Sequence, residues 1–431
     1  MEILRQCLPS SVRRFLEELP ESLNETYERV LREIKKPNRD HARRLLQCLV
    51  VAIRPLRVDE LAEVLAIDFE DAEGIPKLNP SWRWEDQEQA LLSSCSSLIV
   101  IVETDGFRVV QFSHFSVKEF LTSTRLSTSS QDVSRYHIIL QPAHTILAQA
   151  CLSILLRLDD PIEDSGVKKR SPLAQYAAEC WVRHAQFEDV VSHIKGMEYL
   201  FDLDKPYFAA WCRLYDIDND PPDSVFYYFT QRPSSGTETP LYYAALCGFR
   251  NLVEQLIIKY PQHVDVNGGC CMTPVVAALA GRHFQLAQFL HRNGSSVPPR
   301  GLVGRSPLHS AVYFEDLEMV QVLLDYGVDV NAQTDSGINP LNFAPSGTFF
   351  NDPRVVQMLL DYGADPNIQA KTGRIPLLQA SKSGKIEMVR ILVEHGASVE
   401  VEDGQGKTPF DYASGEHRDD IIKLLLEHRV K

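Results

Sequence analysis

The C-terminal part of the sequence repeats one pattern of apolar and polar positions. Each unit has a Ser/Thr/Asn/Ile-Pro-apolar step, a few small residues, a polar interval and an apolar run that ends at glycine. The proline recurs at spacings of 34, 33, 33, 36 and 33 residues, at Pro240, Pro274, Pro307, Pro340, Pro376 and Pro409. The glycine recurs at spacings of 33, 36 and 33 residues, at Gly294, Gly327, Gly363 and Gly396. Two markers with one period predict stacked repeats, with a three-residue insertion within 345–353.

The chemistry of each marker predicts a pair of helices. Ser or Thr can accept a hydrogen bond from the first helical turn, and the following proline has no N–H that needs a partner. Small residues such as Ala311 allow two helices to approach closely. Apolar residues at helical spacing, as at Leu317, Val320 and Leu324, predict a second helix. The terminal glycine suits the left-handed position that ends a helix.

This pattern resembles the ankyrin repeat, which has a period of about 33 residues and a Thr-Pro-Leu-His-x-Ala core. Ser306–His309 is the best match, and Thr273–Val276 is a degenerate one. We predict about six repeats over residues 236–431. The polar second helix of the last unit, 406–431, suits a terminal cap with a solvent-facing side.

The N-terminal part predicts a winged helix. Helical patterns cover 22–35, 40–53, 58–66 and 85–94, and two strand patterns cover 97–103 and 107–112. Asp105-Gly106 between the two strands is a good hairpin signal. Ser116 and Glu119 have the spacing of a capping box for the next helix.

A helical spacer is predicted next. Residues 127–140 are a Ser-rich linker, and helical patterns follow at 142–156, 172–184 and 188–194. Residues 205–235 leave two interpretations open, because Pro206 lies 34 residues before Pro240 and could begin a degenerate capping repeat. The predicted fold class is mainly α, with an N-terminal winged helix and helical spacer followed by an ankyrin-repeat α-solenoid.

Four segments carry a more specific resemblance, to fungal NACHT–ankyrin proteins, which are signal-transducing STAND NTPases related to the NOD-like receptors. These segments are Leu19–Glu28, Arg54–Ala62, Cys95–Leu98 and Phe112–Leu121. The resemblance covers essentially the whole chain. It implies the end of a NACHT module plus a winged-helix domain at 1–125, a helical spacer at 126–235 and ankyrin repeats at 236–431.

The ATPase of that family is not expected in this chain. The nearest approach to a P-loop is Gly406-Lys407-Thr408, but Val401 stands where the first glycine is required. We therefore expect no enzyme activity, no bound nucleotide and no other cofactor or metal. His114 matches a histidine that, in NOD-like receptors, contacts the phosphates of ADP. Here the resemblance implies a vestigial nucleotide-sensor position, with a local hydrogen bond at a helix start.

Composition narrows the choice of partner and compartment. The formal net charge of −14 argues against nucleic acid as the main partner. An acidic stretch at Val58–Leu65, taken as the third helix of the winged helix, leaves DNA binding as a remote alternative. No apolar run reaches the length of a membrane span or a signal-peptide core. Nine scattered cysteines without a C-x-x-C motif suggest buried free thiols in a reducing compartment, and hence a cytoplasmic protein.

Binding is expected on the concave surface made of hairpin tips and first helices. The candidate residues are Arg305, Ile338, Arg374 and Lys407 at the tips, and Tyr313, Phe314 and Lys382 on the helices. Basic tips on an acidic chain suggest an acidic protein partner. Phe314 could instead pack beneath the insertion in the next repeat. The expected function is a non-catalytic protein-interaction scaffold or sensor of a STAND-type signalling receptor. The alternative is an adaptor that targets substrates or membranes for an enzyme complex.

Overall fold

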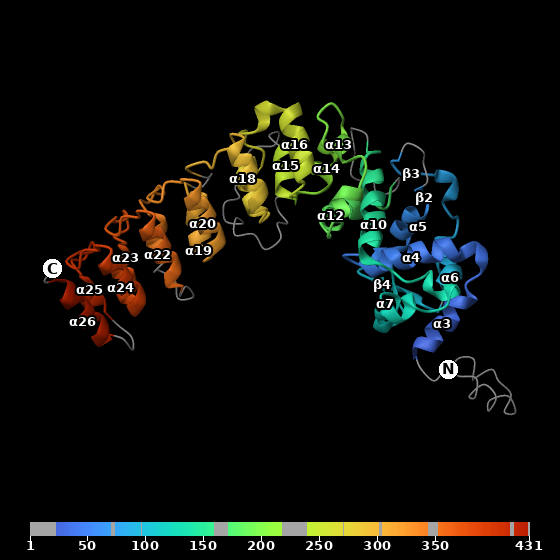
Figure 1. Ribbon diagram of the computed structural model, residues 1–431, viewed down its shortest axis with the longest axis horizontal. Helices are drawn as coiled ribbons and strands as arrows, with labels where there is room; N and C mark the ends of the chain where they lie inside the picture. Colours follow the sequence, from blue (N-terminus) through green and yellow to red (C-terminus); the bar gives the residue numbers. More distant parts are fainter. Residues whose placement is uncertain are drawn as a thin grey trace. The chain divides into compact units, whose positions relative to one another are not determined.

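The computed structural model describes residues 23–69, 74–95, 97–158, 171–217, 239–269, 271–300, 304–343, 352–413 and 418–429. The chain divides into two compact units, Met1–Tyr215 and Asp216–Lys431. Figure 1 colours the first unit from blue to green and the second from yellow-green to red. Helices dominate both units, as the sequence predicts.

The first unit begins with a winged helix. Its helices are α3 Leu23–Glu33, α4 Arg39–Val51, α5 Val58–Leu65 and α6 Gln87–Cys95, and its strands are β1 Leu56–Arg57, β4 Ile99–Thr104 and β5 Phe107–Phe112. The sheet has the order β1-β5-β4, and β5 pairs antiparallel with both neighbours. Asp105 and Gly106 have φ of 53° and 77°, which matches the tight hairpin turn expected for Asp-Gly.

Strand β1 changes the assignment of the third helix. Because β1 directly precedes α5, α5 is the second helix of the winged helix, and α6 is the third. The sequence-based choice of Val58–Leu65 as the third helix was therefore wrong. Seven of the eight residues of α5 are buried, so this helix has no free face for a nucleic-acid groove.

The segment after β5 also differs from the prediction. Helix α7 runs over Phe115–Leu121, and its N-cap is His114 rather than Ser116. The predicted Ser-rich linker contains part of α8 Thr124–Ser127 and the whole of α9 Gln131–Ser134. Val133, Tyr136 and Ile138 are buried there, so this stretch packs as part of the unit.

The helices of the spacer complete the first unit. They are α10 Leu140–Leu155, α12 Ala174–Ala185, the 3-10 helix η3 Val190–His193, α13 Met197–Leu200 and α14 Tyr207–Leu214. The buried rings of Trp181 and Trp211 meet edge to face, with centroids 5.4 Å apart. Helix α14, which covers part of the candidate capping repeat, packs on α10, α12 and α13.

The second unit is a series of six helix pairs within the described residues (Figure 1). The first helices are α15 Pro240–Leu246, α17 Pro274–Ala280, α19 Pro307–Tyr313, α21 Pro340–Phe343, α23 Pro376–Lys382 and α25 Pro409–Tyr412. The second helices are α16 Arg250–Lys259, α18 Phe284–Arg292, α20 Leu317–Asp325, α22 Pro353–Asp361, α24 Ile386–Glu394 and α26 Arg418–Arg429. We number these pairs repeats 1 to 6.

Each first helix begins at the proline that the sequence predicted. The small residues Ala244, Ala277, Ala311 and Ala380 are fully buried in these helices, as close helix packing requires. Most of the insertion within 345–353 lies outside the described residues.

Candidate protein-interaction surface

The tips of repeats 4, 5 and 6 share one backbone geometry. In repeat 4 the N–H of Thr334 donates to the carbonyl of Ile338, and the N–H of Gly337 donates back to the carbonyl of Thr334. The same pair of bonds recurs around Ala370 in repeat 5 and Asp403 in repeat 6. The glycine of each tip has φ of 72–76°, a conformation that L side chains rarely adopt.

This geometry places the residue after the glycine at an equivalent position in successive repeats. Arg305 also follows a glycine of this kind, Gly304, with φ of 72°. The four tip residues predicted from the sequence therefore form one row along the array: Arg305, Ile338, Arg374 and Lys407.

A first aromatic cluster joins the tip of repeat 3 to the end of its first helix. The Arg305 guanidinium lies 5.3 Å from the ring centroid of Phe343, within the range of a cation–π contact. The Tyr313 ring meets the Phe343 ring edge to face at 6.2 Å and the Phe314 ring at 5.1 Å. Phe314 keeps 38% of its surface exposed. Two predicted residues, Arg305 and Tyr313, thus contact Phe343, which the prediction had missed, and the third, Phe314, contacts Tyr313.

A second aromatic cluster lies at the end of the array. The ammonium groups of Lys382 and Lys407 lie 5.6 Å and 5.4 Å from the ring centroid of Tyr412. The Tyr412 hydroxyl donates to the Asp403 carboxylate over 2.6 Å, which fixes the ring between the two lysines. This bond, with those from the backbone N–H groups of Lys407 and Gln405, lowers the pKa of Asp403.

The two clusters share the register of their first-helix residues but not of their tip cations: Arg305 lies one repeat before Phe343, whereas Lys407 and Tyr412 belong to the same repeat. Phe343 and Tyr412 each lie three residues after a helix-start proline, whereas Tyr313 and Lys382 each lie six residues after one. A comparison of repeats at the third position after the proline could have identified both missed rings from the sequence.

Two predicted residues lie outside the clusters. The side chain of Ile338 is half-buried, and its carbonyl accepts a hydrogen bond from His309 Nε2 over 3.0 Å. Arg374 is exposed, and its side chain forms no ion pair or hydrogen bond with the residues that the structure describes.

Gly406-Lys407-Thr408, the nearest approach to a P-loop, is built as a helix cap. The backbone N–H and the hydroxyl of Thr408 both donate to the Asp411 carboxylate over 2.8 Å. An anionic side chain thus already occupies the N–H that a phosphate would need.

His114 makes local contacts at the start of α7. Its Nδ1 accepts from the N–H of Ser116 at 3.3 Å and lies 2.7 Å from the Ser116 hydroxyl. That hydroxyl is 2.8 Å from the hydroxyl of Tyr27 on α3. The ring of Tyr27 packs 5.4 Å from that of Phe120, so His114 belongs to the contact between α3 and α7.

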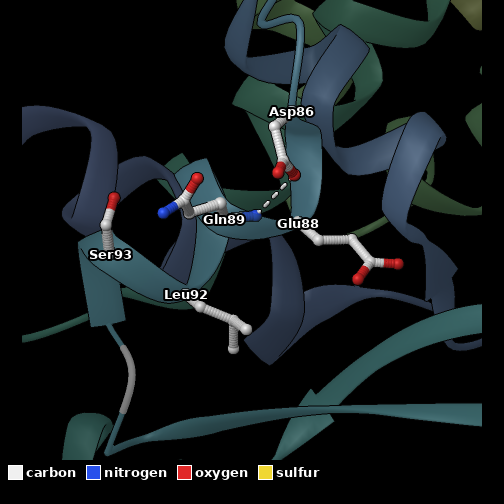
Figure 2. A pocket seen from close by; sticks show the side chains of 5 residues that line it. All are labelled: Asp86, Glu88, Gln89, Leu92 and Ser93. Atoms are coloured by element: carbon white, nitrogen blue, oxygen red, sulfur yellow. Dashed lines mark hydrogen bonds between the residues drawn. The ribbon is translucent and has the colours of Figure 1, made fainter.

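A pocket of the first unit lies along α6, and its carboxylates have structural roles (Figure 2). It is lined by Asp86, Glu88, Gln89, Leu92 and Ser93. Asp86 accepts from the N–H of Gln89 over 3.0 Å at the start of the helix. Glu88 forms an ion pair with Arg108 of the wing. The pocket therefore presents no pair of free carboxylates.

The other predicted chemistry concerns metals, membranes and cysteines. Within the described ranges, no group of three or more His, Cys, Asp or Glu side chains is placed to hold a metal ion. No helix in those ranges combines the length and apolar character needed to cross a membrane. The described cysteines are free thiols; Cys212 is half-buried, and the buried ones are Cys48, Cys95, Cys151, Cys180, Cys247 and Cys271.

Comparisons with known families agree with this architecture. The family described as "Ankyrin repeats (3 copies)" matches residues 241–334 and 341–431. The second unit is an ankyrin-repeat array. The family described as "GPI inositol-deacylase, winged helix domain" matches residues 27–131. The first unit thus carries a winged-helix domain ahead of its helical spacer.

Several known proteins resemble parts of the chain. "Azaphilone pigments biosynthesis cluster protein L" from Monascus ruber is 31% identical over 303 residues, which are 66% of this chain and 61% of that protein. Mouse "Ankyrin repeat and SOCS box protein 9" is 32% identical over 117 residues, 27% of this chain and 39% of its own length. The crystal structure of an ankyrin-repeat domain from Acinetobacter baumannii, at 23% identity, covers 44% of this chain and 97% of that domain, with a TM-score of 0.39. The chain therefore spans under two thirds of the length of these two curated relatives.

Proposed function

We propose that this protein is a non-catalytic interaction scaffold whose ankyrin array binds a protein partner along the tips and first helices of repeats 3 to 6. The observation that carries the proposal is the pair of aromatic clusters whose first-helix residues are in equivalent register. Tyrosine and arginine are favoured anchors of protein interfaces because they combine a large apolar area with a polar end. Spread over repeats 3 to 6, the anchors Arg305, Tyr313, Arg374 and Tyr412 form an elongated contact surface.

Charge complementarity supports an acidic partner. The chain carries a net charge of −14, yet three of the four tip residues are cationic. Arg305, Arg374 and Lys407 form no ion pair with the described residues, and two of them lie over aromatic rings. Arg374 and Lys407 are exposed and Arg305 is half-buried, and such a row of cations attracts an acidic surface and accelerates encounter with it.

That the chain has no catalytic activity is part of the same proposal. Two buried ionisable side chains among the described residues have partners that serve the fold. His309 links two repeats, and Glu63 caps a helix of the spacer. The cap at Thr408 and Asp411 likewise favours a chain without a nucleotide site.

The STAND assignment is also a proposal. It is supported by the match to a winged-helix domain and by the position of His114 at the start of α7. In this interpretation the first unit is the winged-helix part of a STAND-type switch, and His114 is at the position of its nucleotide sensor. Buried thiols in both units are consistent with a cytoplasmic location.

A second candidate is an adaptor that brings substrates or a membrane site to an enzyme complex. The observation that favours it is the name of the Monascus ruber relative, which refers to a pigment biosynthesis cluster. Nucleic-acid binding is a more remote candidate, because the third helix, α6, contains no Lys or Arg to contact phosphates.

A capture experiment tests the scaffold proposal. The full chain is immobilised, and retained proteins from its natural source are identified. The Tyr313→Ala/Arg374→Glu double variant should lose a partner that the parent retains. Arg390→Glu on α24 is the matched control, because Arg390 lies on a second helix and pairs only with Glu387 of the same helix among the described residues. Equal retention by the double variant would refute the placement, and calorimetric binding of ATP or ADP would refute the absence of a nucleotide site.

A further inference from the structure

We propose that the segment recognised by the tips is acidic and adopts the polyproline II conformation, with its side chains in register with the repeats. In this register, successive acidic side chains meet Lys407 and Arg374, an apolar side chain meets Ile338, and another acidic side chain meets Arg305. The inference rests on the proposed function and specifies the chemistry of the partner.

The spacing of the tips follows from their direct contact. A Cβ atom built on Gly337 would lie 3.1 Å from the N of Lys371 in the next tip, and one on Gly373 would lie 3.4 Å from the N of Gly404. Successive tips therefore touch. The first helices below them also pack on one another, and packed helices have axes about 8–10 Å apart. Tip residues at equivalent positions of successive repeats are therefore also separated by about that distance.

Only one regular conformation of a bound segment matches this advance and keeps its side chains on one side. Polyproline II rises about 3.1 Å per residue with three residues per turn, so every third side chain faces the same way after about 9.3 Å. A β-strand advances about 10 Å in three residues, but its side chains alternate between faces. An α-helix needs six to seven residues for the same distance, roughly 1.5 Å each, and its facing side chains drift round the axis.

The chemistry of the row then sets the sequence of the segment. Lys407 and Arg374 lie one repeat apart, which corresponds to acidic residues about three positions apart. Ile338, one repeat further, calls for an apolar residue in the segment, and Arg305, at the end of the row, calls for another acidic one. The expected pattern is acidic-x-x-acidic-x-x-apolar-x-x-acidic, in one chain direction.

The aromatic clusters explain why proline is expected at the intervening positions. Segments in this conformation dock onto aromatic-lined surfaces, and proline reduces the ordering that binding requires. The Tyr412 ring lies beside Lys407, and the Phe343 ring lies beside Arg305. At the Lys407 end the half-buried Tyr412 ring offers an aromatic surface next to a cation. At the Arg305 end Phe343 is buried, and the exposed aromatic ring of the cluster is Phe314.

Fluorescent peptides test the register on the full chain. The in-register probe is Glu-Pro-Pro-Glu-Pro-Pro-Leu-Pro-Pro-Glu, together with its reversed sequence. A permuted peptide of the same composition groups the three glutamates together, and a third peptide replaces every proline by alanine. Fluorescence anisotropy should show one of the two in-register directions binding roughly tenfold more tightly than the permuted and the alanine peptides.

Variants of the chain complete the test. Arg374→Glu should weaken the in-register peptide roughly tenfold, whereas Arg390→Glu should leave its affinity unchanged. Equal affinity for the in-register and permuted peptides would overturn the register. A third outcome is that no peptide binds, although the chain still captures its partner and the Tyr313→Ala/Arg374→Glu variant does not. This outcome would overturn the inference about the segment and leave the proposed function standing. Capture that is insensitive to that double variant would refute the proposed function itself.

Discussion

His309 and Ile338 are joined across the boundary between repeats 3 and 4: His309 Nε2 donates to the Ile338 carbonyl over 3.0 Å. The Nδ1 atom accepts from the backbone N–H of Ser306 at 3.1 Å, so the proton of the neutral ring must be on Nε2. Burial lowers the pKa of His309 to about 4, which keeps the ring neutral. A buried imidazole thus positions the tip residue beside which the proposed partner binds.

Replacement of this imidazole should destabilise the array. His309→Ala leaves the Ile338 carbonyl and the Ser306 N–H without their partner, at a cost of roughly 1–3 kcal/mol. His309→Asn should recover part of that loss, because Asn342 makes the equivalent contacts in repeat 4: its Oδ1 accepts from Asn339 N at 3.0 Å and its Nδ2 donates to Ile368 O at 3.3 Å. Urea unfolding of the three proteins measures the difference. Equal stability of the Ala and Asn variants would contradict the bonding role.

Glu63 should be essential to the contact between the winged helix and the spacer. Its side chain is buried, accepts from the N–H of Leu173 over 2.8 Å at the start of α12, and pairs with Arg83 at 2.5 Å. Glu63→Ala leaves the buried N–H of Leu173 without its acceptor, which costs roughly 1–3 kcal/mol, whereas the exposed Arg83 can be solvated by water. Glu387→Ala, on an exposed face of α24, should stay within about 0.5 kcal/mol of the parent. Thermal unfolding compares the two variants, and similar midpoints would argue against the role of Glu63.

A chain of hydrogen bonds orders two histidines inside the first unit. The N–H of Ile53 donates to the Tyr176 oxygen at 3.3 Å, so the Tyr176 hydroxyl is free to donate to His184 Nε2 at 2.9 Å. His184 then carries its proton on Nδ1 and donates it to His144 Nδ1, also at 2.9 Å. Both rings are neutral in this arrangement, and a proton added to either one disrupts it.

The first unit should therefore lose stability in mild acid. Burial lowers the pKa of His144 to about 4, with a contribution from Lys118, and that of His184 to about 3, with contributions from His144 and Arg183. Because unfolded histidine titrates near 6.5, the unfolded state binds more protons below that pH, and stability falls as the pH drops from about 6.5 to 4. Melting curves across this range should show the decline. His144→Asn/His184→Asn should flatten it, and an unchanged slope in that variant would exclude these histidines as its cause.

The elements predicted correctly are those in which local chemistry and tertiary packing agree. Proline fits the first turn of a helix almost regardless of context, so all six first helices begin where the sequence placed them. Strand β1 has only two residues, too few to show the alternation of apolar and polar positions that marks a strand. Because the prediction lacked β1, it counted α5 as the third helix of the winged helix instead of the second. Ser116 fits a capping box, but β5 ends so close to it that His114 takes the cap instead.

Local chemistry also explains which residues of the candidate surface the sequence could identify. Tip residues follow a glycine that fixes their place, so Arg305 and Lys407 could be found by counting along the repeat. Phe343 and Tyr412 were missed because an aromatic residue on a short amphipathic helix is usually part of the core. Only the packing of neighbouring repeats shows that each ring lies beside a cation.

The cysteines should differ sharply in reactivity in the native protein. Burial raises the pKa of Cys48, Cys95 and Cys180 to about 12, so these thiols contain almost no thiolate near neutral pH. Cys212 is half-buried near the end of α14 and should be alkylated before these three. Short exposure to iodoacetamide followed by peptide mass spectrometry should find label at Cys212 and protection at the other three. Because urea exposes all four side chains, the same reagent should then modify them at similar rates; equal labelling without urea would show that the helices around these thiols open readily.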